Sequence, residues 1–185
     1  MPGYLSASVE GLEDVVDAFD ALDDQIDRAA NRAKNKAAKW AAKQVASGIA
    51  ADDAVPVRAL YKASGSGRHK KRVQISFADH GVGGYAAVWV GYNPIKAAYL
   101  GSLRQQRRGA RAGKHFFERA FLATMRSGHR GVYLRSGNAR LPIDEQYVPL
   151  NSAERNVEAV SRRIPIRLAE LFEQELNYEV NVRGR

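Results

Sequence analysis

Side chains that could perform catalytic or metal chemistry are few and widely spaced in this sequence. The four histidines, His69, His80, His115 and His129, include no pair at the i, i+4 spacing that places two imidazoles on one helical face. The chain has no cysteine, which excludes disulfides and thiolate metal or redox sites. Asp144 and Glu145 form one carboxylate pair, which is more typical of a strand-end or interface charge than of general acid–base catalysis.

Sequence motifs for phosphate or acyl chemistry are also absent. The glycines from Gly81 to Gly84 lack the lysine and the following helix of a P-loop. No nucleophile elbow is present. We therefore predict a protein that is not an enzyme and that uses no metal and no cofactor.

The strongest chemical signal is the distribution of charge. Residues 55–141 contain 17 Lys and Arg against 2 Asp and Glu, a net charge of +15, whereas residues 1–54 carry −4 and residues 142–185 carry −2. A basic middle between acidic ends indicates an anionic partner, and phosphate is the leading candidate. The alternative is that these charges only keep the surface soluble.

Two basic segments supply the candidate phosphate contacts. They are Arg104, Arg107, Arg108, Arg111 and Lys114, followed by Arg68, Lys70, Lys71 and Arg72. Tyr99, Phe116 or Phe117 would be available to stack on bases. Because no helix-turn-helix, zinc finger or RNA-binding aromatic signature accompanies them, the charge supports only non-specific contact with a phosphate backbone.

The stretch from Lys114 to Ile143 organises the rest of the chain. Two apolar runs, Phe116–Met125 and Val132–Leu134, flank a turn in which Gly128 and Gly131 are expected to adopt positive φ. The first run also fits a short helix, because Phe117, Phe121 and Met125 recur every four residues. The glycine-bounded turn favours a β-hairpin.

Helical patterns begin and end the chain. Apolar residues from Leu12 to Ile26 form one stripe opposite acidic residues, and an alanine-rich basic pattern continues over Ala29–Ile49. One long helix and two helices joined near Asp23–Asp27 both fit. Trp40 is predicted to pack rather than to form an interface. We read the acidic residues as a solvated face rather than a metal site.

The remaining elements are expected as follows. Predicted strands cover Tyr4–Val9, Val73–Phe77 and Tyr85–Tyr92, with an extended run from Arg140 to Pro149. Short helical turns are predicted at Val57–Lys62 and Ile95–Leu100, and loops at Ala63–Arg72 and Arg104–Lys114. Asn151 or Ser152 is expected to cap a final helix that is kinked at Pro165, and Tyr178–Val182 is a strand or a tail.

This order of elements predicts an α+β fold: an antiparallel β-sheet with a β-hairpin, packed against long N- and C-terminal α-helices. We expect a single domain over 1–185, with a helical part at 1–50, a basic β-rich part at 55–150 and a C-terminal helix and tail at 151–185. No apolar run reaches the roughly 20 residues of a membrane span, and the N-terminus lacks a signal-peptide pattern. We expect synthesis in the cytoplasm and no membrane partner.

Several local patterns resemble one known family. They are Gly11-Leu12-Glu13 with the basic alanine-rich continuation, Val57-Arg58-Ala59-Leu60, the run Phe117–Arg135 with Met125-Arg126-Ser127-Gly128-His129 at its turn, and Arg140-Leu141-Pro142-Ile143. Together they resemble the minor tail protein Z family of long-tailed bacteriophages, and more loosely the phage tail-completion proteins.

The resemblance implies a structural virion protein of the neck or upper tail that forms a ring, usually a hexamer, and helps head–tail joining and the positioning of the DNA end. Implied partners are further copies of the chain, a tail terminator or tail tube protein, a head–tail connector or head-closure protein, and the phage DNA end, bound without sequence preference. No small-molecule substrate is expected. In such a ring the basic residues named above would face the DNA in the lumen. Candidate protein-interface residues are Phe116, Phe117, Phe121, Arg126, His129, Asp17, Asp20 and Asp24.

Two other functions remain open on the residues alone. One is a free accessory protein that binds nucleic acid non-specifically. The other is a tail-assembly or tip factor that binds only proteins, using the Phe116–Met125 segment as its interface.

Overall fold

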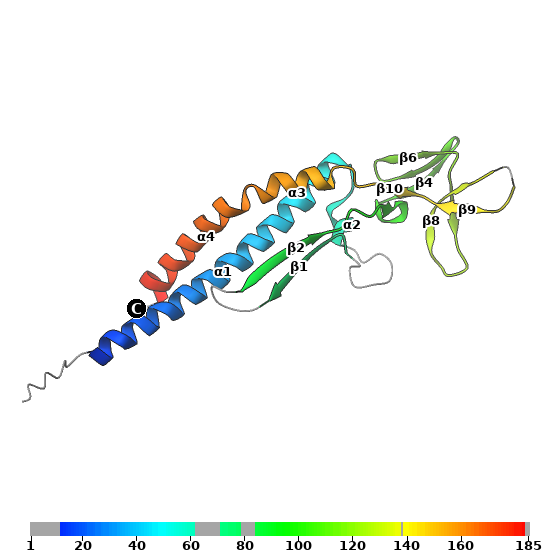
Figure 1. Ribbon diagram of the computed structural model, residues 1–185. Coiled ribbons are helices and arrows are strands. Elements are labelled where there is room, and N and C mark those ends of the chain that lie inside the picture. Colours follow the sequence, from blue (N-terminus) through cyan, green and yellow to red (C-terminus); the bar gives the residue numbers. More distant parts are fainter. Residues whose placement is uncertain (1–11, 62–70, 79–83, 138, 184–185) are drawn as a thin grey trace, which may run out of the picture. The chain divides into compact units, whose positions relative to one another are not determined.

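The structure is a computed structural model and describes residues 12–61, 71–78, 84–137 and 139–183 (Figure 1). Side chains are described for all of these residues except 12–21, 78 and 183. The helices are α1 (Leu12–Asp52), α2 (Val57–Tyr61), η1 (Ala97–Tyr99), α3 (Ala153–Ser161), α4 (Ile164–Tyr178) and the π-helical η2 (Glu179–Arg183). The strands are β1 (Val73–Ala78), β2 (Tyr85–Val90), β3 (Ile95–Lys96), β4 (Leu103–Gln106), β5 (Gly109–Ala112), β6 (His115–Glu118), β7 (Phe121–Thr124), β8 (Arg130–Arg135), β9 (Ile143–Glu145) and β10 (Tyr147–Val148). The predicted α+β class is confirmed.

The described strands form four small sheets rather than one. Their orders are β1-β2, β10-β3, β4-β5-β6 and β7-β8-β9. Adjacent strands are antiparallel in the last three of these sheets. Short strands and tight turns thus keep most pairings local in sequence.

The chain divides into two compact units. The first contains 1–37, 77–86 and 166–185, and the second contains 38–76 and 87–165. In the first, Ala33 and Ala37 of α1 pack against Leu171 of α4, with Leu168 and Phe172 beside them. The organisation of these units into a single domain stays a prediction.

The second unit has the larger core. Small side chains of α1, among them Ala41, Ala42 and Ala46, are almost fully buried and let other elements approach the helix closely. Ile49, Leu60, Val73, Ile95, Val132 and Val160 fill the same cluster. Trp40 packs at its edge, in agreement with the packing role predicted for it, and Arg163 lies over its ring.

The α1 helix is continuous, so of the two alternatives the single long helix is correct. The predicted strands at 73–77 and 85–92 and the turn of α2 are also present, with the second strand ending at Val90. The predicted helical turn at 95–100 is instead the short strand β3 followed by the 3₁₀ turn η1. The predicted strand Tyr4–Val9 and most of the loop Ala63–Arg72 lie outside the described residues.

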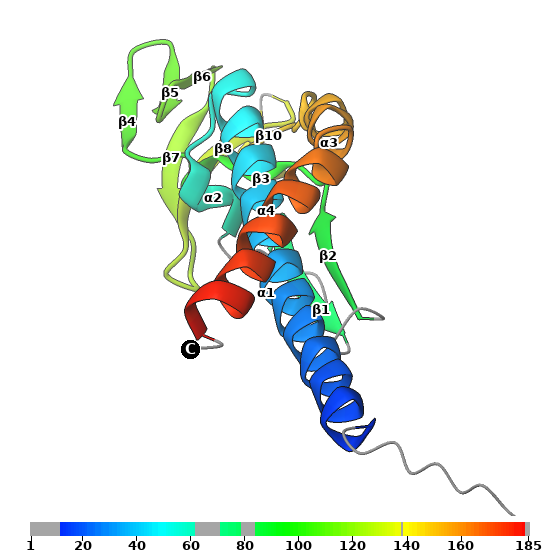
Figure 2. The ribbon, with the colours of Figure 1, turned by 90° about the vertical axis from the view of Figure 1, so that its left-hand side faces the viewer.

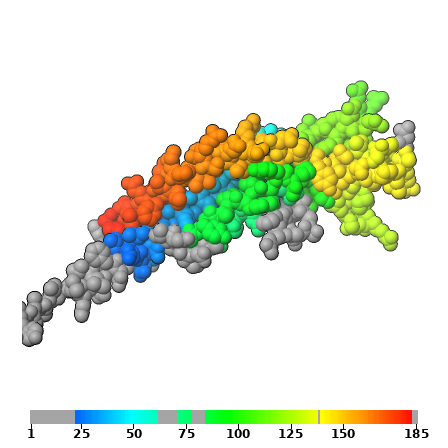
Figure 3. All heavy atoms as spheres, in the orientation of Figure 1, coloured from blue at the N-terminus to red at the C-terminus, as the bar shows by residue number. Residues whose placement is uncertain are grey.

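The loop predicted over Arg104–Lys114 was wrong. This segment contains β4 and β5, which pair with each other, and β5 pairs in turn with β6 (Figure 2). The alternation of arginine with small side chains provides one exposed and one buried face, but its many charges hid this pattern in the sequence. In Figure 3 the light-green spheres of this segment lie at the surface.

The predicted hairpin exists, but it is shorter than predicted. Phe121–Thr124 pairs with Arg130–Gly131-Val132-Tyr133, which rules out the helical alternative. The residues Phe116–Glu118 belong to β6 and face another partner, because Arg119 adopts φ 59° and ends that strand. Gly128 has the expected positive φ of 79°. Gly131 lies within β8, so the positive φ expected for it was wrong.

The C-terminal helix is divided rather than kinked. α3 ends at Ser161, and α4 begins at Ile164, where Pro165 occupies a first-turn position that needs no amide hydrogen. The strand alternative for Tyr178–Val182 was wrong, since η2 continues the helical path. Ser152 is the N-cap residue of α3, but its side chain makes no capping hydrogen bond to the helix.

Candidate nucleic-acid interface

The β4-β5-β6 sheet has one face made of exposed basic and aromatic residues. The register places Arg104 directly opposite Arg111, and Arg111 directly opposite Phe116, so these three side chains form one row across the sheet. All three are exposed, Phe116 by 46%. The row therefore presents two guanidinium groups and an aromatic ring to solvent.

The other face of this sheet is fixed against the core. Ala110 and Ala112 are fully buried, and Leu103 and Phe117 pack on the same cluster. Residues alternate between the two faces of a strand, so burial of this set directs the Arg104–Arg111–Phe116 row outward.

The turns of the sheet add three more cations. Arg107 and Arg108 form the β4–β5 turn, and Lys114 lies in the β5–β6 turn. All are exposed. Within the part of the chain that the structure describes, none of these three, nor Arg104 or Arg111, forms an ion pair. Their charge is available to a partner.

The second predicted basic segment does not join this surface as a whole. Arg68 and Lys70 lie outside the described residues, and Lys71 is exposed. The phosphate-contacting role predicted for Arg72 was wrong, because this side chain is only 7% exposed. Its guanidinium donates to the carbonyl oxygens of Asn93 at 2.8 Å and Pro94 at 3.0 Å. Those bonds hold the loop after β2, so the charge of Arg72 serves the fold.

An open groove of about 590 Å³ lies beside the β4–β5 turn. Gln105, Arg107, Arg108, Gly109, Glu118, Arg119, Ala120, Phe121 and Arg135 line it. The sequence prediction omitted Arg119 and Arg135, because they stand apart from the dense basic run. The pairing of β5 with β6 and the turn into β7 bring these two arginines to the groove. Only the paired-strand arrangement could have identified them.

The residues predicted for protein interfaces have different surroundings. Phe116 and Arg126 are exposed, whereas Phe117 packs against the core. Phe121 is half-buried, with Arg135 over its ring at 5.2 Å. Asp24 is exposed and lies 3.7 Å from Arg28, while the side chains of Asp17 and Asp20 are outside those described.

His129 belongs to a partly buried polar cluster. Its Nε2 lies 2.6 Å from Glu145 Oε1, and Lys96 Nζ donates to Glu145 Oε2 at 2.7 Å. Burial raises the pKa of Glu145, but the hydrogen bonds from Lys96 and His129 outweigh burial and hold that pKa below its ordinary value. The bond to Glu145 raises the pKa of Lys96. The cluster joins strands β3 and β9 to the β7–β8 turn.

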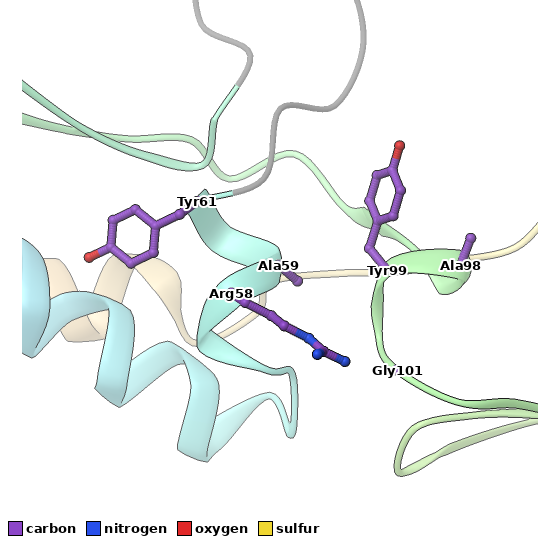
Figure 4. A pocket seen from close by; sticks show the side chains of 6 residues that line it. All are labelled: Arg58, Ala59, Tyr61, Ala98, Tyr99 and Gly101. Carbon is purple, nitrogen blue, oxygen red and sulfur yellow. The ribbon is translucent and has the colours of Figure 1, made fainter.

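Another hollow, of about 420 Å³, lies between α2 and η1 (Figure 4). The side chains of Arg58, Tyr61 and Tyr99 point in different directions in this view and do not converge on one volume. Tyr61 uses its hydroxyl to bind the carbonyl oxygen of Ala42. This geometry does not build a small-molecule site.

Two other kinds of site are absent from the described residues. Among them, no three His, Asp or Glu side chains gather as metal ligands. Within the same residues, no helix combines the length and the apolar character needed to cross a membrane. The exposed basic surface is the most distinctive chemical feature of the described structure.

Comparison with known proteins identifies the family. Residues 9–185 match the family described as prophage minor tail protein Z (GPZ). The chain belongs to this family. No curated protein and no solved structure matches it.

Membership of the minor tail protein Z family supports a structural role in a phage tail, as a virion component that contacts other tail proteins. It also favours a non-enzymatic role, in line with the scattered candidate catalytic groups. The resemblance drawn from the sequence is confirmed over nearly the whole chain.

Proposed function

We propose that this minor tail protein forms a ring at the head-proximal end of the tail, helps head–tail joining and positions the DNA end. In this proposal the outer face of β4-β5-β6 faces the DNA. The observation that carries it is the position of Arg104 directly opposite Arg111 on that exposed face.

Like charges placed directly opposite each other on a sheet destabilise it. Here no carboxylate forms an ion pair with either arginine within the described structure. A phosphate backbone would remove this repulsion by supplying the missing negative charge. Contacts of this kind carry no base information, as suits a protein that must hold any DNA end.

Ring formation is proposed to use separate surfaces. Arg126 and the β7–β8 turn near His129 are candidates for contacts with a neighbouring copy, a tail terminator or tail tube protein, or a head-closure protein. Phe116, also predicted as an interface residue, lies in the row proposed to face the DNA. The acidic positions Asp17, Asp20 and Asp24 of α1 are proposed to meet a basic face of the next subunit. Charge reversal at these three positions should then impair assembly; intact assembly would contradict that contact.

Replacing Arg104, Arg107, Arg108 and Arg111 together by Gln tests the role of the basic face. We expect particles that assemble but position DNA poorly and infect at a much lower frequency. A matched control replaces Lys39, Lys43, Arg58 and Arg140, which are exposed elsewhere, by Gln and changes the net charge equally. Unchanged infectivity of the first variant would contradict the proposal.

The same variant separates the alternatives. A free nucleic-acid-binding protein would lose the salt-dependent DNA affinity of the isolated subunit. A factor that binds only proteins would lose assembly. The solution mass, measured alone and with tail tubes that lack this protein, adds a direct test, because a ring formed on the tube end supports tail completion. A monomer that ignores tubes but binds duplex DNA would favour the accessory protein.

A further inference from the structure

We infer that Arg107, Arg108, Arg119 and Arg135 form a preorganised groove for successive phosphate groups of a nucleic-acid backbone. This inference rests on the proposed DNA-facing role and adds to it two residues, Arg119 and Arg135, that lie outside the basic run. The four arginines come from three parts of the second unit: the β4–β5 turn, the β6–β7 connection and the end of β8.

The groove adjoins the exposed arginine row of the sheet. Gly109 and Glu118 oppose each other in the cross-strand row next to Arg104–Arg111–Phe116, and both also line the groove. A side chain at Gly109 would overlap the backbone of β6, so β5 and β6 pack closely at this point. Gly109 and Glu118 thus place the groove beside the exposed row of the same sheet.

The groove is strongly unbalanced in charge. Its lining contains four arginines and one carboxylate, Glu118. In the part of the chain that the structure describes, none of these four guanidinium groups has an ion-pair partner. Planar guanidinium groups bind the oxygens of phosphate by paired hydrogen bonds.

Arg119 occupies a backbone conformation that disfavours it. Its φ of 59° lies in the left-handed region, where glycine or asparagine is the usual residue. The conformation is held by a hydrogen bond from Arg119 N to Arg108 O, at 2.7 Å. This bond fixes the two arginines side by side. Strained residues of this kind gather at functional sites.

Gln105 holds the two walls of the groove together. Its Nε2 donates to the carbonyl oxygen of Gly109 at 2.9 Å and to that of Ala120 at 3.3 Å, and its Oε1 accepts from Leu122 N at 2.8 Å. One side chain thereby joins the β4–β5 turn to the start of β7. The backbone around Arg107, Arg108 and Arg119 is thereby fixed before any ligand binds.

Arg135 is also held in place. Its guanidinium lies 5.2 Å above the centre of the Phe121 ring, and Nη1 donates to Arg140 O at 3.1 Å. Its Nε and Nη2 make no hydrogen bond within the described structure, so these N–H groups can bind an anion. Phe121 thus acts as a platform for the cation rather than as an exposed apolar contact.

The test is the salt dependence of binding to duplex DNA of random sequence, measured by fluorescence anisotropy. Each phosphate contact that is lost should lower the slope of log affinity against log salt by about 0.9. For Arg119→Gln with Arg135→Gln, we expect a slope lower by about 1 to 2 and at least a tenfold loss of affinity at low salt. Lys39→Gln with Lys43→Gln, at two exposed positions of α1, is the control for charge.

A second variant separates binding from folding. Arg119→Gly removes the charge and suits the left-handed backbone, so it should raise the denaturant midpoint while lowering DNA affinity. Equal or higher DNA affinity in a stably folded Arg119→Gly protein would overturn the inference.

Further outcomes distinguish the groove from the sheet face. If Arg104→Gln with Arg111→Gln lowers the slope but Arg119→Gln with Arg135→Gln does not, the groove is excluded and the proposed function stands. If neither pair changes DNA binding, both fail. If Arg119→Gln with Arg135→Gln abolishes binding to polyglutamate but leaves DNA binding intact, the inference is overturned and the groove is assigned to an acidic polypeptide instead.

Discussion

His129 donates a hydrogen bond from Nε2 to Glu145 Oε1 across 2.6 Å, and this contact ties the β7–β8 turn to β9. Lys96 Nζ donates a hydrogen bond to the other carboxylate oxygen, Glu145 Oε2. The Glu145 side chain is 15% exposed, so both contacts are shielded from water. The Glu145 carboxylate therefore links the turn that contains Arg126 to both β9 and β3.

Glu145→Gln should destabilise the protein by about 2 kcal/mol near neutral pH, because two hydrogen bonds to a charged acceptor are weakened. The pKa of Glu145 is lowered in the folded state, so its contribution to stability is present above the unfolded-state pKa and is lost as pH falls through the folded-state value. The difference between wild type and variant, measured by denaturant unfolding, should shrink as the pH falls below about 4.3.

The matched control is Asp144→Gln, which alters the neighbouring exposed carboxylate. Its own bond, from Ser136, lies at the surface and should matter less. The pKa of Lys96 is raised, so the contribution of Lys96 is present below its ordinary pKa and is lost at more alkaline pH. A variant-to-wild-type difference that grows on acidification would contradict this assignment.

Glu175→Gln with Glu179→Gln should release α4 from α1 within the first unit. Glu179 is 1% exposed and accepts from Arg28 at 3.0 Å and from Arg32, and Glu175 pairs with Arg32 and Lys36. Removing one partner of a buried ion pair costs about 3 to 5 kcal/mol. We expect a large loss of hydrogen-exchange protection in α4.

Glu173→Gln is the control for this network. Glu173 is on the same helix, is exposed and makes no ion pair within the described structure. Its replacement should leave protection unchanged. Equal protection in the double variant and the control would mean that the apolar contacts around Leu171 suffice to hold the helices.

The sequence predicted those elements that local patterns determine. The apolar stripe and the alanine run gave α1, and glycine at Gly128 gave the β7–β8 turn. Family-like motifs predicted the membership that the comparison confirmed. These signals are local, because each depends on residues a few positions apart.

The rest depends on contacts between distant residues. The left-handed backbone conformation of Arg119 divides a run that looked continuous in the sequence. An arginine does not indicate such a conformation, as a glycine would. Arg72 was predicted to belong to the basic surface because its sequence neighbours are basic. In the structure it is buried and donates to carbonyl oxygens more than 20 positions away. The groove around Gln105 likewise required the pairing of β4, β5 and β6.

Gly109→Ala should destabilise the β4-β5-β6 sheet by about 2 kcal/mol or more. A Cβ at Gly109 would overlap the carbonyl oxygen of Phe117, which belongs to the backbone of β6 and cannot move aside as a side chain could. Denaturant unfolding measures the loss. Gly137→Ala, where a Cβ meets nothing within 4 Å, is the control; equal stability of the two variants would show that the strands separate readily.

Gln105→Leu should cost about 1 to 2 kcal/mol, although the residue is largely exposed. Leu122 N loses its acceptor, and the carbonyl oxygens of Gly109 and Ala120 lose a donor. Gln106→Leu changes the next residue, whose side chain makes no hydrogen bond within the described chain. Greater hydrogen-exchange loss at Leu122 in the first variant than in the second is the expected result.

Ser152→Ala should destabilise the protein by about 1 kcal/mol through a contact that is not the predicted helix cap. Ser152 Oγ donates to Asp53 Oδ2 at 2.8 Å, and Ser152 N donates to the same carboxylate at 3.3 Å, so Asp53 joins the end of α1 to the start of α3. Asp53→Asn should cost at least as much, because it weakens both bonds. Asn151→Ala distinguishes this contact from capping: Asn151 is exposed and its side chain makes no hydrogen bond within the described chain, so its loss should change stability by less than about 0.5 kcal/mol. A larger loss for Asn151→Ala than for Ser152→Ala would instead identify Asn151 as the cap of α3.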